Sequence, residues 1–310
     1  MHWNKKGLVF GPSKGTDWLQ SHAQVPTALV KADEGILRVY FATRPEPGRS
    51  MTSFVDLDLN DLSRVKYVHN DFILPVGRPG TFDQHGIMPS SVVEHEGQVY
   101  LYYSGWSRSA GVPYNNFTGL AISSDGGKTF VKHTEAPVLE RNSRELFSAT
   151  SPNVLREGGH WHMWYCSGTN WHEVNGKFEH TYDIKYASSA DGKKWIQNGL
   201  PVIRQKNEFE AITKPAVIRM NGTYHMWYCY RGSEDFRNGK QSYRIGYAQS
   251  KDATNWERMD DQSGIDVSAS GWDSMMIAYP EIVRINDRMI MLYNGNHFGM
   301  EGFGYAELIY

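Results

Sequence analysis

Four acidic residues recur at similar places in the sequence, each beside or near an aromatic residue and five to seven residues before a proline. They are Asp83, Glu145, Glu210 and Asp273. Cleaving a bond to oxygen by acid and base needs two carboxyl groups, one protonated to help the leaving oxygen and one ionised to attack or activate water. We predict Asp83 and Glu210 as this pair, because each precedes a loop that contains glycine or alanine. The alternative is that these acids anchor loops through backbone N–H groups.

Two histidines lie before prolines in the same way, His22 before Pro26 and His85 before Pro89. A histidine with a pKa near its unperturbed value of about 6.5 can donate or accept a proton at neutral pH. We predict that both assist the acids. Packing within the fold is one alternative, and a metal site with Asp83 is another, although the spacing of three ligands is not visible. Our prediction is no metal and no cofactor.

Further residues have the chemistry to bind a substrate. Arg44, Lys214 and Arg231 are basic residues near expected strand ends, and they suit a carboxylate, sulfate or phosphate because arginine holds planar anions in a fork. Their alternative is surface solvation. Glu281 directly follows a proline, and a buried salt bridge is its alternative role. The remaining residues that we predict to bind substrate are polar or aromatic: Gln24, Trp106, Thr150, Asp273 and Tyr279.

A repeat positions these residues. Five prolines, each followed by small and β-branched residues, are spaced by 63, 63, 63 and 65 positions: Pro26, Pro89, Pro152, Pro215 and Pro280. We predict that each proline opens a strand, where its missing N–H does little harm. An aromatic run such as 100–103 follows each of them after turn residues such as Asn221-Gly222, which predicts a second strand.

A third strand, a turn beginning with aspartate and an outer fourth strand complete each repeat, as in 186–203. After the fifth proline only three strands remain, and the N-terminal segment 3–10 reads like the missing fourth. Four antiparallel strands repeated around a ring define a β-propeller blade. The prediction is an all-β, five-bladed β-propeller that forms one domain over residues 1–310, closed by its N-terminal strand.

This pattern resembles the five-bladed propeller glycoside hydrolases of families 32, 43 and 130. The resemblance implies a sugar bound in a funnel at the ring axis, with carboxylates at the starts of the inner strands acting on the glycosidic bond. Those families usually place an acid one or two residues before the inner-strand proline, and here none of these positions is acidic. The segment 123–130 is similar to the Asp-box of sialidase-type propellers, which is a turn far from the active site.

Three functions follow as hypotheses. The first is a glycosidase that acts by carboxylate acid/base chemistry on a sugar in the axial funnel. The second is a non-hydrolytic enzyme, such as a transferase, that modifies sugars or nucleotide sugars in glycan biosynthesis; the missing acids and the basic residues favour it. The third is a propeller that binds carbohydrate without catalysis.

Composition limits the partners. The chain has 32 Lys+Arg and 34 Asp+Glu, a net charge of −2, so it lacks the basic surface of a nucleic-acid binder or a membrane-surface protein. No apolar run reaches the roughly 18 to 20 residues that span a bilayer. The N-terminus has no apolar signal segment, which predicts a cytoplasmic protein.

Cys166 and Cys229 occupy equivalent repeat positions, too far apart for a disulfide, so we predict two buried thiols.

Overall fold

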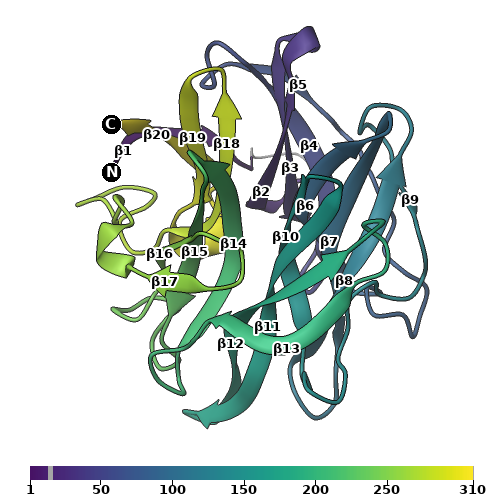
Figure 1. The fold of residues 1–310 in the computed structure, drawn as a ribbon, viewed down its shortest axis with the longest axis vertical. Helices are drawn as coiled ribbons and strands as arrows, with labels where there is room; N and C mark the ends of the chain where they lie inside the picture. The colour runs from purple at the N-terminus through teal and green to yellow at the C-terminus, as the bar shows by residue number, and fades with distance from the viewer. Residues whose placement is uncertain (13–16, 310) are drawn as a thin grey trace.

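The molecule is built almost entirely of β-strands (Figure 1). The computed structural model describes residues 1–12 and 17–309. Within them the helical turns are short: η1 (Ala32–Glu34), η2 (Asp260–Gln262) and α1 (Asn296–Gly299). The strands are β1 (His2–Phe10), β2 (Ser21–Lys31), β3 (Ile36–Arg44), β4 (Met51–Asp58), β5 (Val65–Val68), β6 (Gly86–His95), β7 (Gln98–Arg108), β8 (Tyr114–Ser123), β9 (Val131–Lys132), β10 (Ala149–Glu157), β11 (His160–Val174), β12 (Lys177–Ser189), β13 (Ile196–Ile203), β14 (Ala211–Met220), β15 (Thr223–Arg231), β16 (Arg244–Ser250), β17 (Trp256–Arg258), β18 (Ala278–Ile285), β19 (Arg288–Asn294) and β20 (Phe303–Ile309). The all-β prediction is confirmed.

The strands form three sheets, and none of them closes into a barrel within the described part of the chain. Two have four strands, in the orders β2-β3-β4-β5 and β1-β20-β19-β18. The third contains three antiparallel groups, β6 to β9, β10 to β13 and β14 to β17, joined by single parallel residue pairs. The first strands of the groups contact one another in sequence, β2 with β6, β6 with β10, β10 with β14, β14 with β18, and β18 with β2. In Figure 1 these first strands lie toward the middle of the molecule and β5, β9, β13 and β17 toward its outside.

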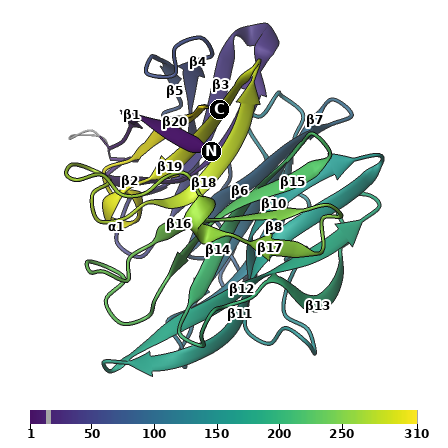
Figure 2. The same cartoon turned by 60° about the vertical axis from the view of Figure 1, so that its left-hand side comes forward.

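The N-terminal strand completes the last group, as the sequence predicts. β1 pairs antiparallel with β20, from His2 opposite Ile309 to Phe10 opposite Phe303. The two ends of the chain therefore lie side by side (Figure 2). This pairing covers an edge of β20 that would otherwise expose unpaired backbone groups.

The repeated prolines lie inside the first strands, so the prediction that they open these strands is wrong. β10 begins at Ala149 and β14 at Ala211, three and four residues before their prolines. The register with the second strand shifts at the proline, as between Thr213 and Ala216. Proline has no backbone N–H, and here it lies at a bulge, where the two strands are not paired residue by residue. Its presence therefore removes no hydrogen bond between the strands. In four of the five strands the residue before the proline has a φ of 49° to 55°: Val25, Ser151, Lys214 and Tyr279.

Aromatic residues of three second strands bind the first, second and third groups to the group that follows each. Each donates a hydrogen bond to a carbonyl in the aspartate turn of the following group: Tyr40 to Gly127 (2.8 Å), Tyr102 to Gly192 (2.6 Å) and Trp164 to Ala253 (2.9 Å). The predicted aspartate turns are confirmed. Asp125, for example, accepts hydrogen bonds from the backbone N–H groups of Lys128 and Thr129. The three acceptor residues have φ between 71° and 82°, a conformation that favours glycine.

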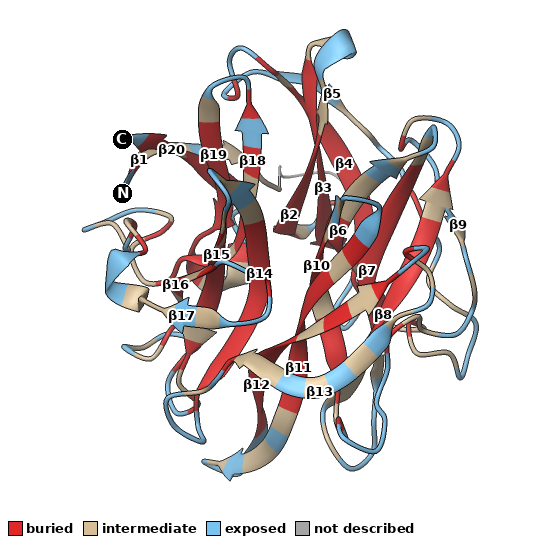
Figure 3. Ribbon diagram, in the orientation of Figure 1, coloured by how far each residue is buried: buried red, intermediate tan, exposed pale blue. Residues whose placement is uncertain are grey.

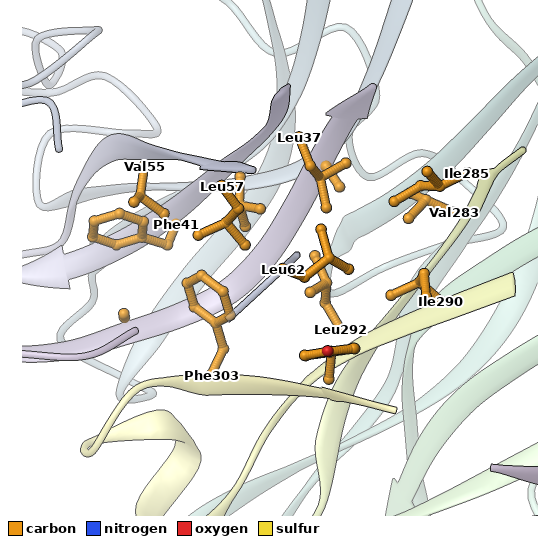
Figure 4. Packing of buried hydrophobic residues seen from close by; sticks show 14 of the residues in the cluster. Leu37, Phe41, Val55, Leu57, Leu62, Val283, Ile285, Ile290, Leu292 and Phe303 are labelled. Atoms are coloured by element: carbon orange, nitrogen blue, oxygen red, sulfur yellow. The ribbon is translucent and has the colours of Figure 1, made fainter. Parts of the chain in front are cut away.

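Hydrophobic cores lie between neighbouring groups, and Figure 3 shows how much of the first three strands of each group is buried. Figure 4 shows the core between β2–β5 and the sheet of β18–β20, where Leu37, Phe41, Leu292 and Phe303 pack together. All four side chains are fully buried. Burying such a side chain contributes roughly 1.5–3 kcal/mol. The first and last groups are therefore held together by packing as well as by the pairing of β1 with β20.

Candidate functional site

The predicted acids are buried and already paired. The Asp83 carboxylate accepts hydrogen bonds from Lys132 Nζ (2.6 Å) and from the Tyr103 hydroxyl (3.0 Å). Lys132 lies on the outer strand β9 and Tyr103 on the second strand β7 of the same group. Asp273 repeats this arrangement with Lys5 (2.7 Å) of β1 and a tyrosine of β19. Each of these acids therefore ties its loop to its own sheet.

Glu145 and Glu210 are also held by side chains of their own groups of strands. Glu145 accepts hydrogen bonds from the Tyr165 hydroxyl (2.9 Å), and Glu210 forms a two-pronged ion pair with Arg258 (2.7 and 2.9 Å). Within the described residues no hydrogen bond or ion pair joins Asp83 to Glu210. These contacts match the anchoring alternative, and the catalytic role of the pair stays a prediction.

The two predicted histidines have different surroundings. Burial, and then the nearby Arg44, lower the pKa of His22 to about 3, so its ring is neutral at neutral pH. His85 Nδ1 accepts a hydrogen bond from the Arg108 backbone N–H (3.2 Å), and its ring stacks on Trp106. No hydrogen bond or ring contact joins the two histidines within the described residues. Their assisting role stays a prediction.

Six of the residues predicted to bind substrate gather where β2, β3, β14, β15 and β18 meet. We call these residues the axial cluster: Gln24, Arg44, Lys214, Arg231, Tyr279 and Glu281. Arg44 Nη2 donates to Gln24 Oε1 (3.4 Å), and Gln24 hydrogen-bonds to the Tyr279 side chain. Burial raises the pKa of Tyr279, while Arg44 and Arg231 act to lower it. The charges of both guanidinium groups therefore act on this hydroxyl.

Arg231 is a buried cation that no described carboxylate pairs with. Only 5% of the residue is exposed. Its two Nη atoms donate to the carbonyl oxygens of Gly232 (2.7 Å) and His180 (3.0 Å), and its Nε has no hydrogen-bond partner. Its guanidinium lies 3.6 Å from the centre of the Phe236 ring. A buried charge is costly unless it is paired. The unused donor and the unbalanced charge both favour an anion.

Lys214 and Glu281 form an ion pair within the axial cluster. Lys214 Nζ lies 2.9 Å from Glu281 Oε2, and the side chains are 1% and 8% exposed. The other carboxylate oxygen of Glu281 accepts a hydrogen bond from the backbone N–H of Ala28 on the neighbouring strand β2 (3.3 Å). Burial raises the pKa of Glu281, and Lys214 acts against this rise. The buried salt bridge that the sequence offered as the alternative for Glu281 is therefore present.

Sequence reasoning missed the tyrosines around Arg231. Burial acts to lower the pKa of the Arg231 guanidinium, but Tyr243, Tyr182 and Tyr114 together raise it. The hydroxyls of Tyr114 and Tyr182 lie 2.6 Å apart. Tyr182 lies in the middle of the third strand β12 and Tyr243 just before the third strand β16, and each precedes a Tyr-Ala pair of its repeat by four residues. Aligning the third repeat with the fourth on this pair would have found both of them.

The other predicted binding residues lie outside the axial cluster. Thr150 is buried, and its hydroxyl has no hydrogen-bond partner. Both ring nitrogens of the buried His180 also lack a partner, and burial lowers the pKa of this histidine to about 3. Trp106 Nε1 donates to Ser50 Oγ (2.7 Å). These polar atoms of Thr150 and His180 are therefore buried without a hydrogen-bond partner.

Asp183 on β12 is a second feature that sequence reasoning missed. It is 7% exposed, and its Oδ1 has no hydrogen-bond partner. Burial raises the pKa of Asp183 to about 7; Glu145 adds to this rise, and Lys185 and Arg204 oppose it. Its carboxyl group is therefore partly protonated at neutral pH.

From the raised pKa of Asp183 we predict that the stability of the protein depends on pH. Its folded pKa of about 7 lies above the ordinary 3.8, so the folded state binds more protons between these values and stability falls as pH rises through this window. Asp183→Asn removes the ionisation, and we expect the stability of this variant relative to wild type to rise from pH 4 to pH 7. Urea unfolding at both pH values and at pH 8 measures the difference, with Asp33→Asn as an exposed control. A difference that does not vary with pH would contradict this role.

The described part of the chain offers no candidate for a metal site or a membrane span. No group of three or more histidine, cysteine, aspartate or glutamate residues there could hold a metal ion. No helix within the same residues has the length and apolar character needed to cross a membrane. Both cysteines are buried free thiols, as predicted.

A cavity of about 630 Å³ adjoins the axial cluster, and we call it the side cavity. It lies between the turn that joins β11 to β12, the loop that leads into β14, and the segment that follows β15. Glu210 and Arg231, predicted as a catalytic and a binding residue, both line it. The structure therefore brings these two predicted residues to one cavity.

Sequence comparisons match the chain to one family model and to several proteins, two of which are described here by name. The family model described as "Glycosyl hydrolases family 32 N-terminal domain" matches residues 60–214, half of the chain. The Mycobacterium tuberculosis (strain CDC 1551 / Oshkosh) protein named "Uncharacterized protein MT1551" is 36% identical over 310 residues, which cover 99% of each chain. A "1,2-beta-oligomannan phosphorylase" from Thermoanaerobacter sp. (strain X514) is 26% identical over 166 residues, 52% of this chain and 51% of that one.

Solved structures share the fold over nearly the whole chain. A structure named "Glycoside hydrolase" has a TM-score of 0.75 at 16% identity and covers 98% of this chain and 91% of its own. A thermostable family-43 glycoside hydrolase has a TM-score of 0.67 at 16% identity and covers 94% and 90%. The resemblance to propeller glycoside hydrolases is thereby confirmed at the level of the fold.

Proposed function

We propose that this chain, which belongs to the glycosyl hydrolase family 32 N-terminal-domain family, is a carbohydrate-active enzyme that acts at the axial cluster and holds an anionic group there. In this proposal the five four-stranded groups are the blades of one propeller domain over residues 1–310. The first strands meet at its axis, which supports a site at the point where their bulged residues converge.

The observation that carries this proposal is the buried Arg231. Its charge has no carboxylate partner in the described chain, and its Nε lacks a hydrogen bond. Arg44 adds a second guanidinium, which donates a hydrogen bond to an amide, that of Gln24. Guanidinium groups bind carboxylate, sulfate and phosphate through two parallel hydrogen bonds. A phosphate or a charged sugar would therefore balance the charge of the cluster.

The sugar would lie beside this anion. Gln24 and Tyr279 offer an amide and a hydroxyl group on the strands that meet there, and polar groups of this kind bind sugar hydroxyls. With phosphate bound, its oxygen would replace water as the group that attacks the sugar carbon of the glycosidic bond. The bond to the leaving oxygen would break, this oxygen would take up the proton that the attacking phosphate loses, and a sugar phosphate and a shortened sugar chain with a free hydroxyl would form. The relative named as an oligomannan phosphorylase supports this non-hydrolytic reaction.

Hydrolysis by Asp83 and Glu210, with His22 and His85 assisting, is the second candidate function. One observation favours it: Glu210 lines the same cavity as Arg231. The ion pairs of both acids weigh against it, because each carboxylate is already bound by a lysine or an arginine of its own group of strands. We place it second for this reason.

A product assay separates the two candidates. The protein is incubated with β-1,2-linked mannooligosaccharides, sucrose and arabinooligosaccharides, each with and without inorganic phosphate. We expect a sugar phosphate, seen by ³¹P NMR, to appear only when phosphate is present. Release of free sugar at the same rate without phosphate would favour hydrolysis. No turnover of any substrate would remove the support for catalysis at the axial cluster.

A further inference from the structure

We propose that the side cavity binds an uncharged sugar residue of an oligosaccharide, beyond the residue held at the axial cluster. This inference rests on the proposed function and adds to it the class of substrate: a chain of at least two or three sugars, of which the outer part is neutral. The site would therefore select for chain length.

The size and shape of the side cavity suit a sugar. Its volume of about 630 Å³ lies within the range of roughly 300–1,000 Å³ of small-molecule sites. Its walls come from three separate segments: 173–175, 207–210 and 230–234, with Gln241 beside the last. A site walled by three segments can contact a ligand from several sides.

An aromatic surface is exposed at the rim of the side cavity. Phe209 is 44% exposed, and its ring packs against His172 with 4.8 Å between the ring centres. Tyr230 lines the same cavity. Exposing an apolar ring costs free energy unless a ligand covers it. The apolar face of a sugar ring would cover Phe209, while its hydroxyls remain free to form hydrogen bonds.

The polar residues of the side cavity favour a neutral ligand. Glu173 and Glu234 line it and are exposed, and Glu234 accepts a hydrogen bond from the Gln241 side-chain amide (3.0 Å). The charge of Glu210 is already balanced by Arg258. Two further carboxylates would repel an anion here, but they accept hydrogen bonds from sugar hydroxyls. The outer part of the ligand is therefore neutral although the axial cluster favours an anion.

Arg231 connects the two places. It lines the side cavity, and its charge also acts on Tyr279 in the axial cluster. Arg231 is almost fully buried, and its Nε is unpartnered. A ligand in the side cavity would therefore lie against Arg231, the residue proposed to bind the anion. One oligosaccharide can reach both.

Binding of neutral trisaccharides tests this inference without any need for turnover. The probes are β-1,2-mannotriose, maltotriose, cellotriose and 1-kestose, and ligand-observed NMR measures the dissociation constant of each. We expect at least one to bind wild type. Phe209→Ala should weaken that binding roughly three- to tenfold through the lost ring contact, and Glu234→Gln should weaken it about tenfold. Phe178→Ala is the matched control, because Phe178 is also 44% exposed but does not line the cavity.

The outcomes separate this inference from the proposed function. If no trisaccharide binds wild type, or if Phe209→Ala and Phe178→Ala bind alike, the side cavity is not a sugar site. Inorganic phosphate is titrated in the same samples. Phosphate binding that is retained while sugar binding is absent would overturn the inference and leave the proposed function standing. Sugar binding that depends on Phe209, in a protein that does not bind phosphate, would support the inference and overturn the proposed anion site.

Discussion

Replacing Arg231 by lysine is expected to weaken the binding of inorganic phosphate by about 10- to 100-fold. Lysine keeps the positive charge but loses the planar fork of donors, and hydrogen bonds to charged groups contribute about 1.5–3 kcal/mol. The Arg231 Nε is free to bind such an anion because no described group uses it. Isothermal titration calorimetry with phosphate measures the change directly.

Arg237→Lys provides the matched control. Arg237 also stacks on Phe236, at 4.3 Å from the ring centre, but it forms an ion pair with Glu179 (2.6 Å) and is half exposed. We expect phosphate binding to be unchanged in this variant. Equal loss of affinity in both variants would show that the stacking on Phe236 matters, and not the free donor of Arg231.

Glu281→Gln is expected to lower the free energy of unfolding by about 3–5 kcal/mol, because it leaves the buried Lys214 without a counter-charge. Lys214 is 1% exposed, so water cannot replace the lost partner. Thermal and urea unfolding measure the loss. An effect below about 1 kcal/mol would mean that Lys214 is not held as a buried cation.

The double variant Lys214→Met, Glu281→Gln separates stability from function. Removing both charges also removes the unpaired ion, so we expect most of the lost stability to return. Phosphate binding should remain weaker than in wild type, since one cation of the axial cluster is gone. A double variant that is fully stable and binds phosphate normally would give Lys214 a purely structural role.

The sequence predicts the strand pattern well because each repeat carries its own signal. The proline period, the aromatic second strands and the aspartate turns correspond to the observed groups, and segment 3–10 does pair as the missing strand. The starts of the first strands were misplaced because a bulge allows proline inside a strand. Bulges depend on the partner strand, and the residues of one strand alone do not reveal them.

The candidate site was harder to predict than the fold. The structure brings Gln24, Arg44, Lys214, Arg231 and Tyr279 together because all lie near the ends of strands that meet, and their role in binding substrate stays a prediction. The partners of Asp83 and Glu210 lie on outer strands far along the chain, so a loop carboxylate that binds a lysine looks the same in sequence as one that is free. Charge balance in a buried place is a property of the fold, and the unpaired Arg231 could only be seen there.

Soaking a crystal of the protein in tungstate, a tetrahedral oxyanion like phosphate that scatters strongly, tests the central claim most directly. Our account predicts an anomalous peak within hydrogen-bonding distance of the Arg231 guanidinium, near Tyr279 and Arg44. Tungstate bound only at other places on the protein, with the Arg231 position empty, would contradict it.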